Sequence, residues 1–284
     1  MHFLQGRPGP MVPASTRDPS GPNGRNLGLL LGALLGANVG FAQAPPPVSP
    51  AGFHTSLVAV ESQRTPFVRG FLRLGGNRCA IAIGPRLELF ALGSTPRPAF
   101  DLRTDDLATI AAATTAGTVI ACALRSGTIH WIDTNTGQVT HTCPGPANAF
   151  GATALPTGDV LLQANPTWPQ SGSHSGVWLA GPGRQPREIL ALQGPSGPLL
   201  VDHHGDLIVA ELGAIVPPPL GASRLLRIPA AKLQLALAGA TLTIADVVQT
   251  GAGFAGIYAL AEDDLGCLHT TDPASSLVTH CAPG

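Results

Sequence analysis

The residues of this sequence best suited to bind a metal ion or a ligand are a group of acidic side chains that follow strand-like runs. Glu211 and Glu262 each end an apolar run that begins after a glycine, and Asp263 and Asp264 follow directly. Carboxylate oxygens are the ligands that Ca²⁺ and other hard divalent cations prefer. The acids therefore predict a candidate metal site, while a solvated acidic rim without a bound ion is the competing interpretation.

Other candidate ligand groups lie in the long insertion 165–175. Asn165 and His174 can join the acids around a metal, and Trp168 can provide an apolar platform for a sugar or a peptide or else cover its own loop. A second long insertion spans 213–222. We expect both insertions to connect a second strand to a third strand, and therefore to lie on one face with the acids. Loops on a rigid scaffold are the usual binding surface, so this face is the predicted ligand site.

Several histidines are also spaced in ways that could allow them to bind a metal ion or take part in catalysis. His130 with His141, and His269 with His280, are predicted to face each other across hairpins. Two neutral imidazoles on one face can ligate a transition metal. These positions are expected on outer strands, so we interpret them as exposed surface histidines. Residues 202–204, Asp-His-His, are interpreted as a polar tight turn rather than a catalytic cluster.

A gapless internal match provides the framework for these residues. Segments 116–141 and 255–280 are identical at eight of 26 aligned positions. Glycines that begin a strand-like run recur at intervals of 41 to 51 residues, at Gly76, Gly117, Gly158, Gly205 and Gly256. Repeated units of about 40 residues with four short strands are typical of β-propeller blades.

Two blades resemble known propeller families. GTIHWIDTNTGQV at 127–139 resembles the quinoprotein-type propeller repeat, and GPLLVDHHGDLIVAEL at 197–212 resembles the NHL and gluconolactonase-like pattern. Both resemblances imply a β-propeller, but further quinoprotein motifs are absent from the sequence, so a quinone cofactor is not implied. Lactonase-like propellers use rim acids and an Asn around a metal, which is the chemistry that the second resemblance implies.

The expected fold is an all-β propeller of four-stranded antiparallel blades. Five blades fit the marker glycines, and six blades or part of a larger ring remain open. The propeller is assigned to 55–284, after a Pro-rich linker at 43–54 and a leader with a secretory signal at 1–42. In that leader, arginines precede the apolar run 27–37, which is too short to span a bilayer. We therefore expect a secreted or periplasmic protein without a membrane span in the mature chain.

Composition excludes several classes of function. The net charge is −1 and only 12% of residues are charged, so no basic surface for nucleic acid is expected. The five cysteines lack metal-site spacing. No G-x-S-x-G, phosphate-loop or H-E-x-x-H motif occurs in the sequence. The leading hypothesis is a non-catalytic module that binds a protein, peptide or carbohydrate. The alternative is a metal-dependent hydrolase or lactonase with Ca²⁺ or another divalent cation.

Overall fold

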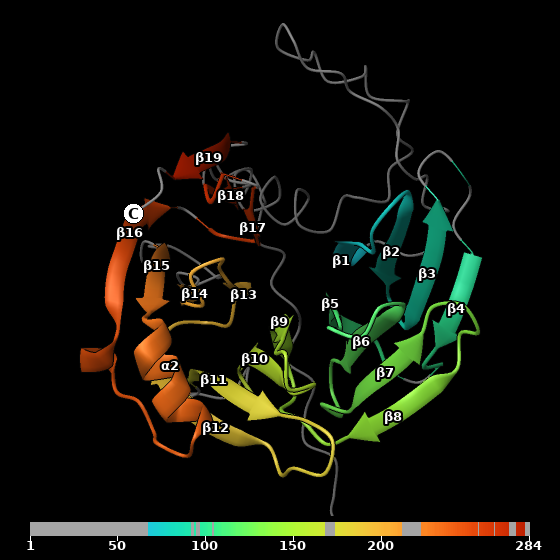
Figure 1. Ribbon diagram of the computed structural model, residues 1–284, viewed down its shortest axis with the longest axis horizontal. Coiled ribbons are helices and arrows are strands. Elements are labelled where there is room, and N and C mark those ends of the chain that lie inside the picture. The colour runs from blue at the N-terminus through green and yellow to red at the C-terminus, as the bar shows by residue number, and fades with distance from the viewer. Residues whose placement is uncertain are drawn as a thin grey trace, which may run out of the picture. The chain divides into compact units, whose positions relative to one another are not determined.

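The computed structural model describes residues 68–91, 94, 97–103, 105–167, 174–211, 223–254, 256–263, 265–272 and 277–281. The expected leader (1–42) and linker (43–54) lie outside these residues. The described residues form four four-stranded sheets and one three-stranded sheet, all antiparallel, around a common centre (Figure 1). The chain is therefore an all-β propeller, as the repeat predicted.

Each four-stranded blade uses four consecutive strands, and the first strand of each blade contacts the first strand of the next. The first two blades, from the inside outward, are β1 (Val68–Arg73), β2 (Arg78–Ile83), β3 (Arg86–Ala91) and β4 (Arg97–Asp101), then β5 (Leu107–Ala112), β6 (Thr118–Ala123), β7 (Ile129–Asp133) and β8 (Val139–Cys143). The next two are β9 (Ala149–Ala154), β10 (Val160–Ala164), β11 (Ser175–Ala180) and β12 (Arg187–Leu192), then β13 (Leu199–Val201), β14 (Leu207–Glu211), β15 (Ser223–Ile228) and β16 (Val248–Phe254).

The fifth blade differs from the sequence-based prediction by one strand. Its described strands are β17 (Ala259–Glu262), β18 (Leu268–Asp272) and β19 (Leu277–Cys281). Because β17 contacts the innermost strand β13, it is the first strand of this blade (Figure 1). The prediction that 257–262 form a second strand is therefore wrong. The internal match aligns the second, third and fourth strands of blade 2 with the first, second and third strands of blade 5.

A helical insertion in blade 4 causes this shift. Helix α2 (Ala230–Leu237) and the 3₁₀ helix η1 (Ile244–Asp246) lie between β15 and β16. The run AAKLQLAL consists largely of good helix formers, and Leu233 and Ala236 are buried in the core. The Arg187 guanidinium donates hydrogen bonds to the carbonyl oxygens of Ala236 and Ala240 at the end of the helix. In the described part of the chain, no helix has the length and apolar character needed to cross a bilayer.

The core consists of apolar layers between neighbouring blades. Successive side chains of a strand point to opposite faces, so each second strand contributes to two layers. In β6, Val119 and Ala121 pack toward blade 1, while Ile120 and Cys122 pack toward blade 3. These alternating apolar positions hold the blades together.

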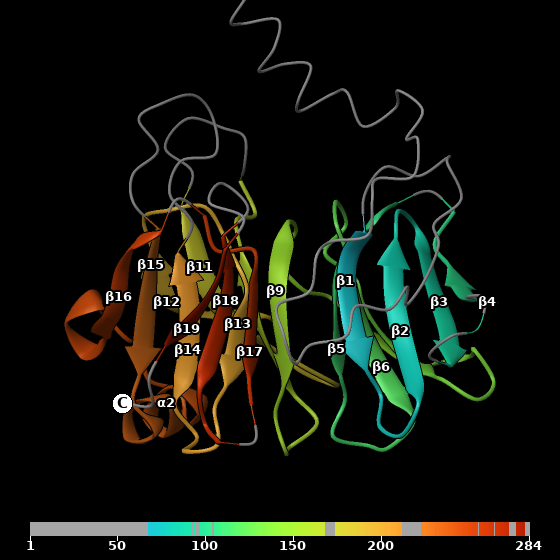
Figure 2. The same cartoon turned by 90° about the horizontal axis from the view of Figure 1, so that it is seen from above.

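Strand direction sorts the connections onto two rims. We call the face at the top of Figure 2 the upper rim; it carries the connections from second to third strands and those between blades. The opposite face, the lower rim, carries the turns from first to second strands and helix α2 (Figure 2). A residue at the end of a first strand and one at the end of a second strand therefore lie on opposite rims.

Candidate functional site

Glu211 lies at the upper rim, where β14 ends, and its carboxylate is already bonded. Oε1 accepts hydrogen bonds from the backbone N–H groups of Gln193 (3.0 Å) and Gly194 (2.5 Å). Oε2 accepts one from Nε of Arg224 (2.8 Å), and the two side chains form an ion pair. Only 4% of Glu211 is exposed. This predicted metal ligand therefore ties the link between blades 3 and 4 to the β14–β15 hairpin.

Blade 3 presents three buried polar side chains with atoms that lack a hydrogen-bond partner within the described protein. The unpaired atoms are both amide atoms of Gln163, Oδ1 of Asn165 and Oγ of Ser175. The three residues are 0%, 4% and 0% exposed, respectively. We call Gln163, Asn165 and Ser175 the polar strip. Buried polar groups are normally hydrogen-bonded, so a contiguous unpaired set is unusual.

Strand register places the polar strip in the interface between blades 3 and 4. Gln163 pairs with Val177, and Val177 and Leu161 belong to the apolar layer that blade 3 shares with blade 4. Side chains alternate along a strand. Gln163 and Asn165 therefore lie on the same face as Leu161, and Ser175 lies on the same face as Val177. In β14, Val209 packs into the same layer, which places Glu211 on the facing surface.

Hydrogen bonds from the backbone and from two side chains hold the Asn165 end of the polar strip in position. The Asn165 N–H donates to the Asn148 carbonyl, and the Asn148 side-chain amide donates to the Asn165 carbonyl, both at 3.2 Å. The Ser196 hydroxyl also donates to the Asn148 carbonyl, at 3.3 Å. Asn165 was a predicted site residue, whereas Gln163 and Ser175 were missed. A single Gln in the apolar run VLLQA was the available sequence signal.

The structure says less about the other candidate ligand-binding residues of insertion 165–175. His174 is exposed, and its Nε2 lies 3.2 Å from Oε1 of Glu188. Trp168 lies outside the described residues, as does the whole insertion 213–222. The strand ends that flank both insertions, at Asn165 and Glu211, lie on the upper rim because both follow second strands.

Glu262 lies on the opposite, lower rim because it ends the first strand of blade 5. The expectation that Glu211 and Glu262 share a rim is therefore wrong. Glu262 Oε2 accepts a hydrogen bond from the backbone N–H of His203 (2.9 Å), and Oε1 lies 2.5 Å from His203 Nδ1. The hydrogen bond that His203 donates to Glu262 raises the pKa of His203 above its ordinary value. The 202–204 turn thus links blade 4 to blade 5 in addition to reversing the chain.

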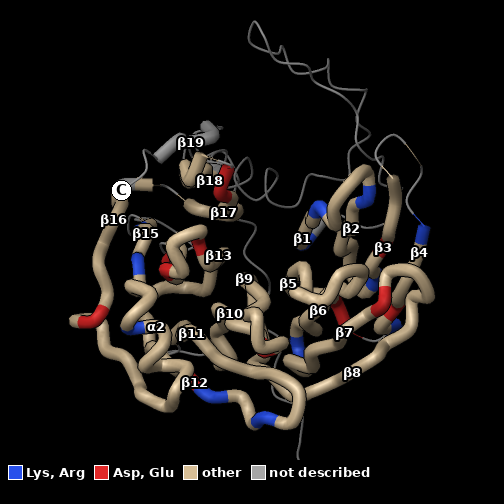
Figure 3. The backbone as a smooth tube through the Cα atoms, in the orientation of Figure 1, with Lys and Arg blue, Asp and Glu red and all other residues tan. Residues whose placement is uncertain are grey.

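The neighbouring acid Asp263 also has bonded partners; Figure 3 shows acidic segments in red beside β13 and beside β18. Its Oδ1 accepts the backbone N–H groups of Leu265 and Cys267, and Oδ2 lies 2.9 Å from Nε2 of His269. The hydrogen bond from His269 lowers the pKa of Asp263. Asp264 lies outside the described residues. Among the residues that the structure describes, no group of three or more His, Cys, Asp or Glu side chains is arranged to hold a metal ion.

The predicted facing pair of His130 and His141 is not formed. A β-bulge between Trp131 and Ile132 shifts the β7–β8 register, so His130 faces Thr142 and Trp131 faces His141. A bulge places two residues of one strand opposite one of the other, which the sequence spacing did not reveal. In blade 5, His269 and His280 do face each other in the register of β18 and β19, as predicted.

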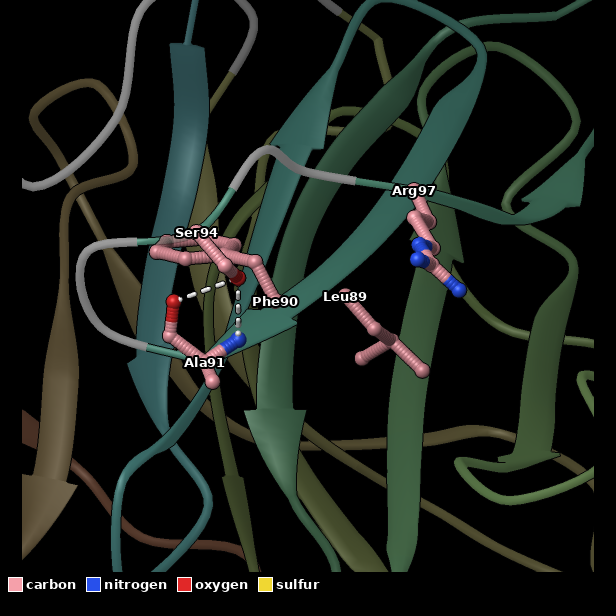
Figure 4. A pocket seen from close by; sticks show the side chains of 5 residues that line it. All are labelled: Leu89, Phe90, Ala91, Ser94 and Arg97. Carbon is pink, nitrogen blue, oxygen red and sulfur yellow. Dashed lines mark hydrogen bonds between the residues drawn. The ribbon is translucent and has the colours of Figure 1, made fainter.

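A cavity of about 350 Å³ lies at the β3–β4 hairpin of blade 1 (Figure 4). Leu89, Phe90, Ala91, Ser94 and Arg97 line it. The Ser94 hydroxyl donates to the Ala91 carbonyl (2.7 Å) and accepts from the Ala91 N–H (3.0 Å). Besides this bonded pair, the cavity presents the apolar side chains of Leu89 and Phe90 and the side chain of Arg97.

Comparison with known proteins supports the fold. No protein-family model matches the chain, and a search of curated proteins found no match. A structure titled as a nidogen/laminin complex superposes with a TM-score of 0.57 at 13% identity, covering 77% of this chain and 76% of the other. Hydrazine synthase from Kuenenia stuttgartiensis gives 0.54 at 9% identity, covering 83% and 62%.

A Bacteroides thetaiotaomicron protein of unknown function gives a TM-score of 0.50 at 11% identity, covering 74% of this chain and 56% of that one. This chain therefore spans less than two thirds of the latter two structures. Identities this low carry information on fold alone. With the five sheets and the recurring sequence units, they define the chain as a β-propeller repeat protein.

Proposed function

We propose that the chain is an exported β-propeller that binds a protein, peptide or carbohydrate on its upper rim without catalysing a reaction. The observation that carries this proposal is that the strand ends that flank insertions 165–175 and 213–222 lie on the upper rim of two adjacent blades. Loops that a rigid scaffold carries on one face are the usual binding surface, so this arrangement favours a role in binding.

The acids that motivated the hydrolase or lactonase alternative are distributed in a way that favours binding. Glu211 is bonded to Arg224 and to two backbone N–H groups on the upper rim. Glu262 and Asp263 lie on the lower rim and bond to histidines. A metal held jointly by Glu211 and Glu262 would need ligands from both rims. The candidate metal ligands that remain together for the hydrolase or lactonase alternative are therefore Glu262 and Asp263 on the lower rim.

The proposal is tested on the mature chain with two ligand sets, neutral mono- and disaccharides and short capped peptides. Binding is detected by calorimetry and mapped by amide hydrogen exchange. We expect protection near Asn148, Gln163 and Ser196 on the upper rim. Protection confined to the turn at 202–206 would contradict the proposal. Divalent cations provide the comparison with the alternative, because an ion bound to the native state must raise the melting temperature. A large rise together with metal-dependent ester or lactone hydrolysis would favour the enzyme.

A further inference from the structure

Blade 5 has an outer edge that the described strands leave unpaired. Each of the other four blades ends in a fourth strand, whereas the described sheet of blade 5 runs β17–β18–β19 and ends at β19. The strands that correspond to β19 in the other blades, β3, β7, β11 and β15, pair with a strand on both sides. The outward N–H and C=O groups of an edge strand are a template for one further strand. Among the described residues, blade 5 therefore lacks the strand that every other blade has at this position.

The series of blades is also open on the inner side, at β17. The main contacts between first strands join β1 to β5, β5 to β9, β9 to β13 and β13 to β17, and in the described part of the chain no contact of similar extent joins β17 to β1. In β5, which has neighbours on both sides, 107–111 are buried, whereas Ala259 and Ala261 of β17 are exposed. Blades 1 and 5 are the two ends of this series around the common centre (Figure 1). The described strands by themselves therefore do not close the ring.

The face of blade 1 that points away from blade 2 carries apolar side chains that need a cover. Ala80 of β2 packs toward blade 2, so the residues on either side of it, Cys79 and Ile81, point away from blade 2. Together with Ile83 and Phe90 they form a cluster in which every member is at most 7% exposed, and which contains no residue of another described blade. Neighbours within one sheet lie beside a side chain and do not cover its end. Burial of this cluster therefore requires residues from outside blade 1.

The chain that precedes β1 has the length and the pattern for the missing strand. Residues 56–61, which lie outside the described residues, read SLVAVE, an apolar run of strand length between polar residues. Residues 62–67 separate this run from β1. The links from a fourth strand to the next first strand have similar lengths, at 102–106, 144–148, 193–198 and 255–258. A strand at 56–61 therefore reaches β1 by the same kind of link that joins the other blades.

We propose that residues 56–61 bind to the outer edge of β19 as the fourth strand of blade 5 and so close the propeller ring. The segment runs antiparallel to β19, as β4 does to β3, and pairs with the outward N–H and C=O groups of β19. Its side chains alternate, so Leu57 and Ala59 join one face of blade 5 and Val58 and Val60 join the other. One of these faces meets blade 4, and the other turns toward blade 1. This interaction within the chain is independent of the ligand proposed for the upper rim.

A segment of the same chain is favoured over a second copy or a foreign strand at this edge. The short link at 62–67 tethers 56–61 next to blade 1, and a short tether gives an effective concentration of about millimolar. Closure also covers an edge that is otherwise a template for pairing between molecules. The occupant of the β19 edge is therefore assigned to the chain itself.

Amide hydrogen exchange of the unaltered chain from Gln43 onward is the first test. A paired strand protects its N–H groups, so the amides of 57–60 should exchange about tenfold or more slowly than those of the linker at 43–54. Equal exchange rates in the two segments would overturn the proposal. Size-exclusion chromatography should give a monomer. A dimer whose dissociation on dilution speeds exchange in both 56–61 and β19 would show that a second copy provides the strand, and would overturn the proposal as well.

The variants Val58→Pro and Ala59→Pro test where the segment binds. Successive N–H groups of an edge strand point alternately to its neighbour and to solvent, so one of the two prolines removes a donor to β19 and the other does not. We expect one variant to speed exchange of the β19 amides about tenfold and to lower the melting temperature by about 3 °C, and the other to have a smaller effect. Val48→Pro, in the linker, is the control and should change neither quantity.

Three results of this comparison decide the proposal. Unchanged exchange of β19 in both variants would overturn it. Faster exchange in β4 instead of β19 would place the segment on the edge of blade 1 and would overturn it too. Val58→Gly and Ala59→Gly weaken a strand without removing a donor, so they provide the same readout if a proline variant does not fold.

Discussion

Glu211 and Arg224 lie directly opposite each other on β14 and β15, and their side chains form an ion pair within blade 4. The same carboxylate accepts the N–H groups of Gln193 and Gly194 in the link between these blades. One residue thus joins a hairpin to the blade that precedes it. This arrangement gives Glu211 a structural role in joining blades 3 and 4.

Glu211→Ala should lower the free energy of unfolding by about 2 kcal/mol, because it leaves a guanidinium and two backbone N–H groups without their acceptor. Chemical denaturation measures this change. Glu188→Ala is the control, because its partner His174 is largely exposed and surface pairs contribute less than about 1 kcal/mol. Equal losses in the two variants would show that the Glu211 contacts contribute no more than a surface pair.

The pair of His203 and Glu262 should make stability depend on pH. Because Glu262 raises the pKa of His203 in the folded state, the pair's contribution is fully present below the unfolded value near 6.5 and is lost as pH rises through the folded value. Glu262→Gln should bring the His203 pKa down toward 6.5, as measured by NMR titration. Thermal melting should then show a smaller loss of stability between mildly acidic and mildly basic pH in the variant. An unchanged His203 pKa would contradict the assigned cause.

Asp105 should stabilise the link between blades 1 and 2. Its carboxylate accepts the backbone N–H groups of Arg125 (3.1 Å) and Ser126 (2.9 Å) in the β6–β7 turn. Asp105→Ala should therefore cost about 1 kcal/mol or more in unfolding free energy. The adjacent Asp106 is exposed, so Asp106→Ala provides a matched control with an expected change of less than about 0.5 kcal/mol. The reverse order of the two variants would disprove the assignment.

The buried thiols of blade 2 should be unreactive in the folded protein. Burial raises the pKa of Cys122 to about 12 and that of Cys143 to about 11. Since the thiolate is the nucleophile, iodoacetamide at pH 8 should leave both unmodified in native protein and should label both after unfolding. Site-resolved mass spectrometry distinguishes the cysteines. Equal labelling rates before and after unfolding would mean that these thiols are accessible in the native state.

The propeller class could be predicted from the sequence because strands and turns are encoded locally. Runs such as TVIACAL alternate between two apolar layers, and Gly117 and Gly137 both adopt positive φ in turns. The candidate site could be predicted only in part. Asn165 and Glu211 were found at the upper rim, whereas the unpaired state of Gln163 and Ser175 depends on what blade 4 places against them. Pairing across blades has no local sequence signature.

By itself the sequence determined the repeating β units and their apolar layers, because these depend on side-chain alternation over a few residues. Only the tertiary structure decided which rim each acid occupies. Neighbouring strands run in opposite directions, so an error of one strand moves a strand end to the other rim. The insertion of α2 and η1 into blade 4 causes that error for Glu262. The two acids that appeared equivalent in the sequence therefore lie on opposite faces of the propeller, each with a different partner.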